Sequence, residues 1–156
     1  HTAYRRQRQM CIRDRDGIHL PKPLLQFVYK FKGADKTALC TDAMRGAGMP
    51  DGESILGSLT NGQKVIIEDG VAKLPDRSAF AGSVATADRL VRTMINIAGI
   101  PLIDAIRMIT LTPARILHVD AQKGSLEEGK DADIVIFDNQ INITTTISEG
   151  HVIYNQ

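Results

Sequence analysis

Aromatic residues and cysteines are scarce in this chain of 156 residues, and tryptophan is absent. With aromatics at 4%, the chain lacks the stacked rings on which proteins that bind single-stranded nucleic acid depend. Cys11 and Cys40 are too few for a disulfide framework, which favours a reducing, cytoplasmic location. No apolar run approaches the length of a membrane span and no signal-peptide core is present, so we expect no membrane partner.

Motifs for metal and phosphate binding are missing as well. No HxH or HExxH spacing occurs, and neither His118 nor His151 has a histidine or cysteine at ligand spacing. We interpret both as structural, His118 at a helix end and His151 in an exposed hairpin. The glycines from Gly46 to Gly52 match neither a GxxxxGK(S/T) phosphate loop nor a GxGxxG fingerprint. They indicate either a mobile active-site loop or a plain connection.

The formal net charge of +1 hides an uneven distribution of charge. Residues 1–15 hold five arginines and one acid, which leaves the rest of the chain 14 of the 19 basic and 17 of the 18 acidic residues, a net charge of −3. Residues 16–156 lack the excess of basic residues that is typical of nucleic-acid-binding domains, so we expect no nucleic-acid partner for them. Two interpretations of residues 1–15 stay open: a basic arm that binds nucleic acid, or a non-native or disordered segment.

With 43% hydrophobic and 24% charged residues, the chain has the composition of a globular domain of ordinary size. A helix is predicted from Pro21 or Pro23 to Gly33, where the glycine ends it. A buried strand over residues 36–40, which includes Cys40, follows after a short link. A helix, a short link and a strand that ends in an acid are typical of one repeat of a parallel α/β architecture.

Turn residues and hydrophobic periodicity divide the rest of the chain. Asp69-Gly70 predicts a two-residue hairpin turn between strands at 64–67 and 71–74. Residues 43–58 and 78–85 are expected to be loops, because small residues and glycines punctuate them. Helices are predicted at 86–98, 101–109 and 113–117, the last capped by Thr112, and antiparallel strands at 132–137, 141–147 and 151–154.

Asp42 is the candidate catalytic residue, because it ends the predicted strand and precedes the glycine-rich loop. Catalytic groups lie in this position at the C-terminal rim of parallel β-structures. A carboxylate there can act as a general base, cap a helix or form a structural ion pair. His19 lies one helix and one strand upstream, where it can share a pocket with Asp42 or cap the following helix. Arg115 indicates either an anion site or an ion pair within the helical section.

A series of short motifs occurs along the chain in a recognisable order. They are Asp16-Gly17-Ile18-His19, Leu39 to Met44 (LCTDAM), Asp69 to Ala72 (DGVA), Ala81-Gly82-Ser83, Thr112 to Arg115 (TPAR) and Gly124 to Asp133 (GSLEEGKDAD). Together they resemble the C-terminal portion of the N-acetylglucosamine-6-phosphate deacetylases, in the amidohydrolase superfamily. The last motif alone indicates only the superfamily, whereas DGIH, TDAM and AGS in this order are more specific.

The resemblance implies an α/β fold in two parts. Residues 16–122 would be the last βα units, the C-terminal part of a (β/α)8 TIM-barrel metal-dependent hydrolase, and residues 123–156 antiparallel strands of a small β-sandwich domain. It also implies a divalent metal, zinc or iron or similar. The family's metal ligands, a glutamate and two histidines, are expected upstream of this chain. We therefore expect the polypeptide alone to be inactive and its full-length parent to be a homodimer.

The resemblance also implies a reaction and a set of site residues. The reaction is hydrolysis of the acetamide of N-acetylglucosamine 6-phosphate to glucosamine 6-phosphate and acetate, in amino-sugar catabolism. Asp42 matches the family's general base and acid, which takes a proton from the attacking water and returns it to the leaving amine. Alternatives are another C–N hydrolase of the superfamily, dihydroorotase- or dipeptidase-like, and a non-catalytic module with a basic arm. The phosphosugar-binding residues implied are Asp16, Gly17, Ile18, His19, Phe80, Ala81 and Gly82.

Overall fold

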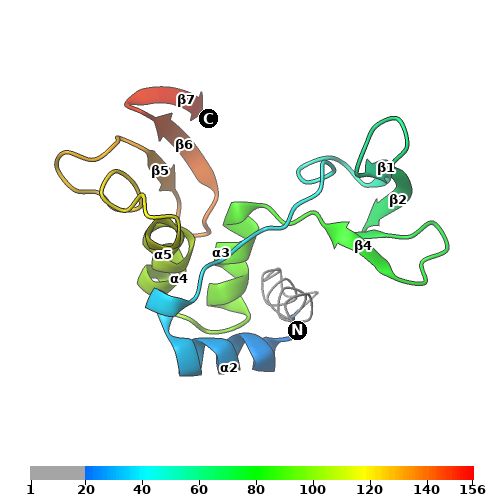
Figure 1. The fold of residues 1–156 in the computed structure, drawn as a ribbon, viewed down its shortest axis with the longest axis horizontal. Coiled ribbons are helices and arrows are strands. Elements are labelled where there is room, and N and C mark those ends of the chain that lie inside the picture. The colour runs from blue at the N-terminus through cyan, green and yellow to red at the C-terminus, as the bar shows by residue number, and fades with distance from the viewer. Residues whose placement is uncertain (1–19) are drawn as a thin grey trace. The chain divides into compact units, whose positions relative to one another are not determined.

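The computed structural model describes residues 20–156 (Figure 1). The chain divides into two compact units. Among the described residues, unit 1 consists of residues 20–21 and 40–90, and unit 2 of residues 22–39 and 91–156. The domain boundary proposed near residue 122 stays a prediction. No helix of residues 20–156 is long and apolar enough to cross a membrane.

Unit 1 contains a four-stranded antiparallel sheet in the order β1-β2-β3-β4. The predicted hairpin is confirmed: Asp69 and Gly70 have φ angles of 54° and 73°, and Glu68 pairs with Val71 across the turn. Two positive φ angles in succession are the geometry that an Asp-Gly pair favours in a tight hairpin. The strands are β1 (Gly52–Leu56), β2 (Gln63–Glu68), β3 (Val71–Lys73) and β4 (Phe80–Ser83).

Two loop predictions in this unit are wrong, because β1 lies within residues 43–58 and β4 within residues 78–85. Both strands pair with members of the predicted hairpin, β1 with β2 and β4 with β3. Glycine and small residues give β1 and β4 little strand signal of their own. They are strands because their backbones form hydrogen bonds with the two strands of the predicted hairpin.

The core of unit 1 lies on one face of this sheet. Side chains alternate along a strand, and Val65 and Ile67 of β2 both point inward, with 1% and 4% of their surface exposed. A few buried side chains complete the cluster, and partly buried ones from the loop after Asp42 pack against it. The buried members are Ala72, Ala81 and Val84, and the partly buried ones are Met44, Ala47, Leu56 and Leu74.

Unit 2 begins with helix α2 (Lys22–Lys32), which confirms the helix predicted from Pro21 or Pro23 to Gly33. Gly33 ends it with a φ of 67°. Two side-chain hydrogen bonds hold the helix in place within the unit. Tyr29 donates its hydroxyl to Asp104 Oδ2 at 2.5 Å, and Gln26 donates to the carbonyl of Ala98 at 3.1 Å.

The other predicted helices are also present. They are α3 (Ala87–Asn96), which lies across the division between the units, α4 (Leu102–Ile109) and α5 (Leu111–Ile116). The cap predicted at Thr112 is wrong, because Thr112 is the second residue of α5. Its buried hydroxyl donates instead to the carbonyl of Ala34 at 2.8 Å. A residue that looks like a cap in sequence therefore joins α5 to the short 3-10 helix η1 (Ala34–Lys36).

The buried strand predicted at 36–40 is wrong as well. Lys36 belongs to η1, residues 37–39 form no strand, and Cys40 contributes only an isolated bridge. The amide of Leu39 donates to the carbonyl of Met108 at 2.8 Å, at the end of α4. Cys40 is exposed, contrary to the prediction that it is buried. A strand needs a neighbour over its whole length, and within residues 20–156 this segment has none.

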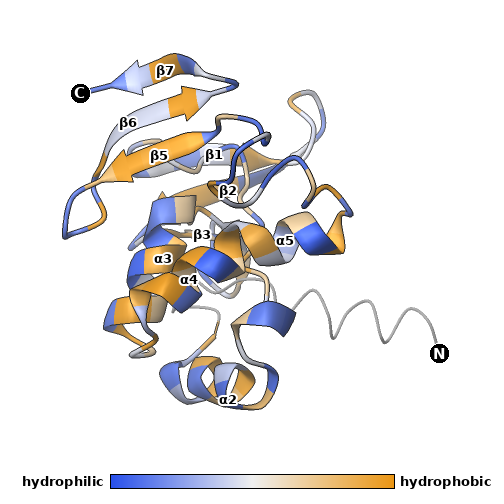
Figure 2. Ribbon diagram, turned by 90° about the vertical axis from the view of Figure 1, so that its left-hand side faces the viewer, coloured by the Kyte–Doolittle hydropathy of each residue, from blue (hydrophilic) through white to orange (hydrophobic). Residues whose placement is uncertain are grey.

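The chain ends in an antiparallel sheet of β5 (Ile134–Phe137), β6 (Ile143–Ser148) and β7 (His151–Asn155), as predicted. Figure 2 shows β5 as almost uniformly apolar and β7 as mixed. The carboxylate of Asp133 connects this sheet to the preceding loop. It accepts hydrogen bonds from Lys123 Nζ at 2.6 Å and from the amide of Glu149 at 2.9 Å.

Candidate functional site

The structure brings Asp42 next to β4. Ala43 forms a parallel bridge with Ser83, and the amide of Met44 donates to the carbonyl of Ser83 at 2.8 Å. Phe80, Ala81 and Gly82, the predicted substrate-binding loop, form the rest of β4. Two segments that the sequence marked separately as catalytic and substrate-binding are therefore neighbours. Both belong to unit 1.

Asp42 is presented to solvent on a left-handed backbone. Its φ is 44°, a conformation that is uncommon for residues other than glycine and is enriched in aspartate and asparagine. Outliers of this kind cluster at functional sites, where the surrounding structure holds them. The side chain is exposed, and within residues 20–156 its carboxylate has no hydrogen bond or ion pair. The carboxylate is therefore accessible from solvent.

The three residues of β4 next to Ser83 differ in their exposure. Ala81 is buried in the core of unit 1, whereas the Phe80 ring is 52% exposed. The pairing of β4 with β3 is irregular between Phe80 and Ser83, and Gly82 lies next to Leu56 and Met44, which pack against the core. The φ of Gly82 is 121°, and a Cβ added there would lie 3.6 Å from Leu56 and 3.8 Å from Met44. These would be ordinary contacts, so the positive φ, and not a lack of space, favours glycine at this position.

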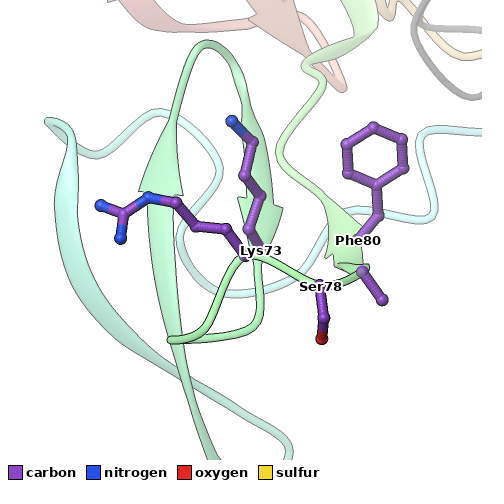
Figure 3. A pocket seen from close by; sticks show the side chains of 5 residues that line it. Lys73, Ser78 and Phe80 are labelled. Carbon is purple, nitrogen blue, oxygen red and sulfur yellow. The ribbon is translucent and has the colours of Figure 1, made fainter.

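An open hollow of ≈ 350 Å³ lies beside Phe80, lined also by Lys73, Arg77, Ser78 and Ala79. Figure 3 shows Lys73 and Phe80 on the same side of the neighbouring strands, with Ser78 pointing the other way. The two are directly opposed across β3 and β4, which places them on one face. Lys73 carries no sequence signal as a site residue, although the Asp-Gly turn fixes its register.

Both cations of this hollow are neutralised by acids of the hairpin. Hydrogen bonds to Asp69 at 2.8 Å and to Glu68 at 3.2 Å raise the pKa of Lys73 above its usual range. Arg77 donates to Glu68 at 2.8 Å, and this bond, followed by that of Lys73, lowers the pKa of the Glu68 carboxyl. The hollow thus offers an aromatic face without a free cation among its lining residues.

The remaining predicted residues have varied outcomes. Asp16, Gly17, Ile18 and His19 lie outside the described residues. Arg115 forms an exposed ion pair with Asp35 at 3.4 Å, which confirms the ion-pair alternative for this residue. His118 has a φ of 59° just after α5, and His151 is exposed at the start of β7.

A metal site is not formed by residues 20–156. In this part of the chain, no three or more histidine, cysteine, aspartate or glutamate side chains are grouped so that they could hold an ion. The described residues therefore do not fit the metal that the resemblance implies.

Comparisons with known proteins support the resemblance. The model of the amidohydrolase family matches residues 16–153. An N-acetylglucosamine-6-phosphate deacetylase from Lysinibacillus sphaericus is 39% identical over 137 residues, which are 88% of this chain and 34% of that protein. An N-acetylgalactosamine-6-phosphate deacetylase from Escherichia coli O157:H7 is 36% identical over 118 residues, which are 76% of this chain and 30% of that protein.

A solved structure agrees in fold. It is a variant of the N-acetyl-D-glucosamine-6-phosphate deacetylase from Mycobacterium smegmatis in complex with N-acetyl-D-glucosamine-6-phosphate. The TM-score is 0.80 at 28% identity, over 90% of this chain and 36% of that one. The predicted fold class is thereby confirmed: part of a TIM-barrel hydrolase, followed by antiparallel strands of a β-sandwich domain. The chain spans about a third of the length of these curated relatives.

Proposed function

This chain belongs to the amidohydrolase family, and on that premise we propose that it carries the proton-transfer and sugar-binding part of an N-acetylglucosamine-6-phosphate deacetylase. The proposed reaction is hydrolysis of the acetamide of the phosphosugar, which yields glucosamine 6-phosphate and acetate. The observation that carries the proposal is the pairing of the Asp42 segment with β4. It brings the matched general base and the matched substrate loop into one unit.

Asp42 would move the protons of this reaction. Its carboxylate takes a proton from the attacking water, and the water oxygen then forms a bond to the acetamide carbon. The C–N bond breaks, and the protonated Asp42 gives the proton to the leaving nitrogen, so that a free amine and acetate result. The divalent metal of the family, zinc or iron or similar, would be held by ligands upstream of Asp16, outside residues 20–156.

The sugar would lie against the open face of β4. Phe80 is exposed there, and Ala81 and Gly82 are proposed to contact the sugar as the resemblance implies. His19, with Asp16, Gly17 and Ile18, is proposed to contact the phosphosugar as the resemblance implies. A homodimer and a cytoplasmic location stay predictions.

A second substrate of the same class is favoured by one of the relatives. The Escherichia coli O157:H7 relative is named for N-acetylgalactosamine 6-phosphate, and its identity of 36% is close to the 39% of the Lysinibacillus sphaericus relative. The two sugars differ only in the configuration of one hydroxyl, and the acetamide chemistry is the same. The choice between them depends on contacts with that hydroxyl.

The test is a chimera, because the chain spans about a third of its curated relatives. Residues 16–156 would replace the matching segment of the Mycobacterium smegmatis deacetylase, and acetate release from both phosphosugars would be measured. We expect release from at least one sugar, and the ratio of kcat/KM values identifies the preferred one. A folded chimera that releases no acetate from either sugar would refute the proposed function.

A further inference from the structure

The turn that presents Asp42 is held by backbone and side-chain anchors outside the residue itself. Within residues 20–156 the Asp42 carboxylate has no partner, and its φ of 44° is a strained conformation. Such a conformation persists only where neighbouring contacts determine it. Those contacts come from the segment after Asp42 and from the sheet of unit 1.

Gly46 provides the first anchor. It is buried against the sheet, and a Cβ added at this position would overlap the Cδ1 atom of Ile67. It would also lie 3.3 Å from Ile67 Cγ1 and 3.4 Å from Ser54 Oγ. Ile67 is only 4% exposed in the core of unit 1, so its side chain has little room to move away. The chain after Asp42 can therefore lie this close to β2 only because residue 46 has no side chain.

Arg45 provides the second anchor. Its guanidinium donates a hydrogen bond to the carbonyl of Gly57, 2.5 Å away, just beyond the end of β1. The Met44 amide donates to Ser83 of β4 at 2.8 Å, and Ala47 then donates back to the Met44 carbonyl at 3.0 Å. The segment is thus fixed to three strands within a few residues of Asp42.

We propose that Arg45 and Gly46 are positioning residues, which hold the left-handed backbone conformation at Asp42 by fixing the following segment to the sheet. The inference rests on the proposed function in so far as Asp42 is the proton-transfer group. Neither residue touches the substrate in this proposal. Both act through the backbone that joins them to Asp42.

The test uses the full chain and the exchange rate of the Met44 amide, followed by NMR together with the Asp42 side-chain carboxyl signal. Gly46→Ala is expected to speed exchange of the Met44 amide about tenfold or more, because overpacking forces the segment off the sheet, and to shift the Asp42 signal. Ile67→Val removes the overlapping methyl group, so Gly46→Ala/Ile67→Val should restore both readouts. Ile67→Val alone is the matched control and should leave both near their original values.

Arg45→Ala is the second variant, because Arg45 is exposed and its loss does not threaten folding. It should also speed exchange of the Met44 amide and shift the Asp42 signal. Unchanged exchange and an unchanged Asp42 signal in both Gly46→Ala and Arg45→Ala would overturn the proposal, and so would failure of Ile67→Val to rescue Gly46→Ala. None of these readouts requires catalysis, so an inactive chimera counts against the proposed function alone.

Discussion

Replacing Thr37 with valine is expected to stabilise the chain, although Thr37 is one of its most buried residues. The side chain is 2% exposed, and its hydroxyl has no hydrogen-bond partner among the described residues. Valine has nearly the same shape and keeps the same contacts, but it has no polar group to bury. The substitution therefore removes an unsatisfied hydroxyl without creating a cavity.

The size of the effect follows from the cost of burying a polar group. An unpaired hydroxyl in a protein interior costs about 1–3 kcal/mol relative to one in water. We expect Thr37→Val to raise the free energy of unfolding by about 1 kcal/mol, toward the low end of that range, because the methyl group that replaces the hydroxyl must fit the same space.

Thr112 is the matched control, because it is equally buried but its hydroxyl is bonded. It is 1% exposed and donates to the carbonyl of Ala34 at 2.8 Å. Thr112→Val leaves that carbonyl with only the longer hydrogen bond from the Thr37 amide, at 3.4 Å. We expect a loss of about 1–2 kcal/mol from the free energy of unfolding.

Urea denaturation followed by circular dichroism measures both variants against the unsubstituted chain. The same chemical change, at two buried threonines of unit 2, is expected to shift the midpoint in opposite directions. If Thr37→Val destabilises the chain as much as Thr112→Val, the Thr37 hydroxyl has a partner after all. The assignment of it as unsatisfied is then wrong.

Three further predictions concern the proposed catalytic residue and the dependence of stability on pH. Asp42→Asn in the chimera should lower kcat for acetate release by about 10²- to 10⁴-fold. Asp51 is an exposed acid of the same loop, and Asp51→Asn should leave acetate release unchanged. Equal effects of the two substitutions would contradict the proposed role of Asp42. The hydrogen bond to Asp104, desolvation and the Asp104 charge raise the pKa of Tyr29 above its usual 10.0. Because the folded state then holds the proton more tightly, stability should fall as pH rises above about 10, and Tyr29→Phe should flatten this decline in alkaline urea titrations. Hydrogen bonds from Lys123 and from the Glu149 amide lower the pKa of the Asp133 carboxyl below its usual 3.8. The ionised carboxylate therefore stabilises the folded state above pH 3.8, and this stabilisation is lost as the pH falls through the folded pKa. Asp133→Asn should have a lower free energy of unfolding at neutral pH, and that free energy should fall less on acidification below pH 3.8. An unchanged dependence of the free energy of unfolding on acid pH would count against this prediction.

The elements that the sequence predicted are those whose signals are local. The Asp69-Gly70 turn carries its own backbone preference, and α2 ends at a glycine that has the required positive φ. The elements that it missed depend on distant partners. β4 is a strand because Val71 pairs with Ser83 and Lys73 with Phe80, not because of its own small residues.

The same distinction applies to the candidate site. Asp42 could be proposed from sequence because it follows an apolar run and precedes glycines. Its contact with β4 depends on the Ala43–Ser83 bridge, which joins residues far apart in the chain. Only the family resemblance anticipated that the two segments belong to one site. The anchors at Arg45 and Gly46 carried no sequence signal beyond a glycine in a glycine-rich loop.

Asp42, the proposed proton shuttle, and Asp133 are held in place in different ways. Asp133 is held by its side chain, and the same hydrogen bonds from Lys123 and Glu149 that fix it also lower its pKa. A carboxylate stabilised in this way in its charged form is a weak base. The Asp42 carboxylate has no such partners among residues 20–156, and its place is set by the bonds of Met44 and Arg45 and by the fit of Gly46. Fixing the backbone instead of the carboxylate positions the group and leaves both of its oxygens accessible for the proposed contact with water and substrate.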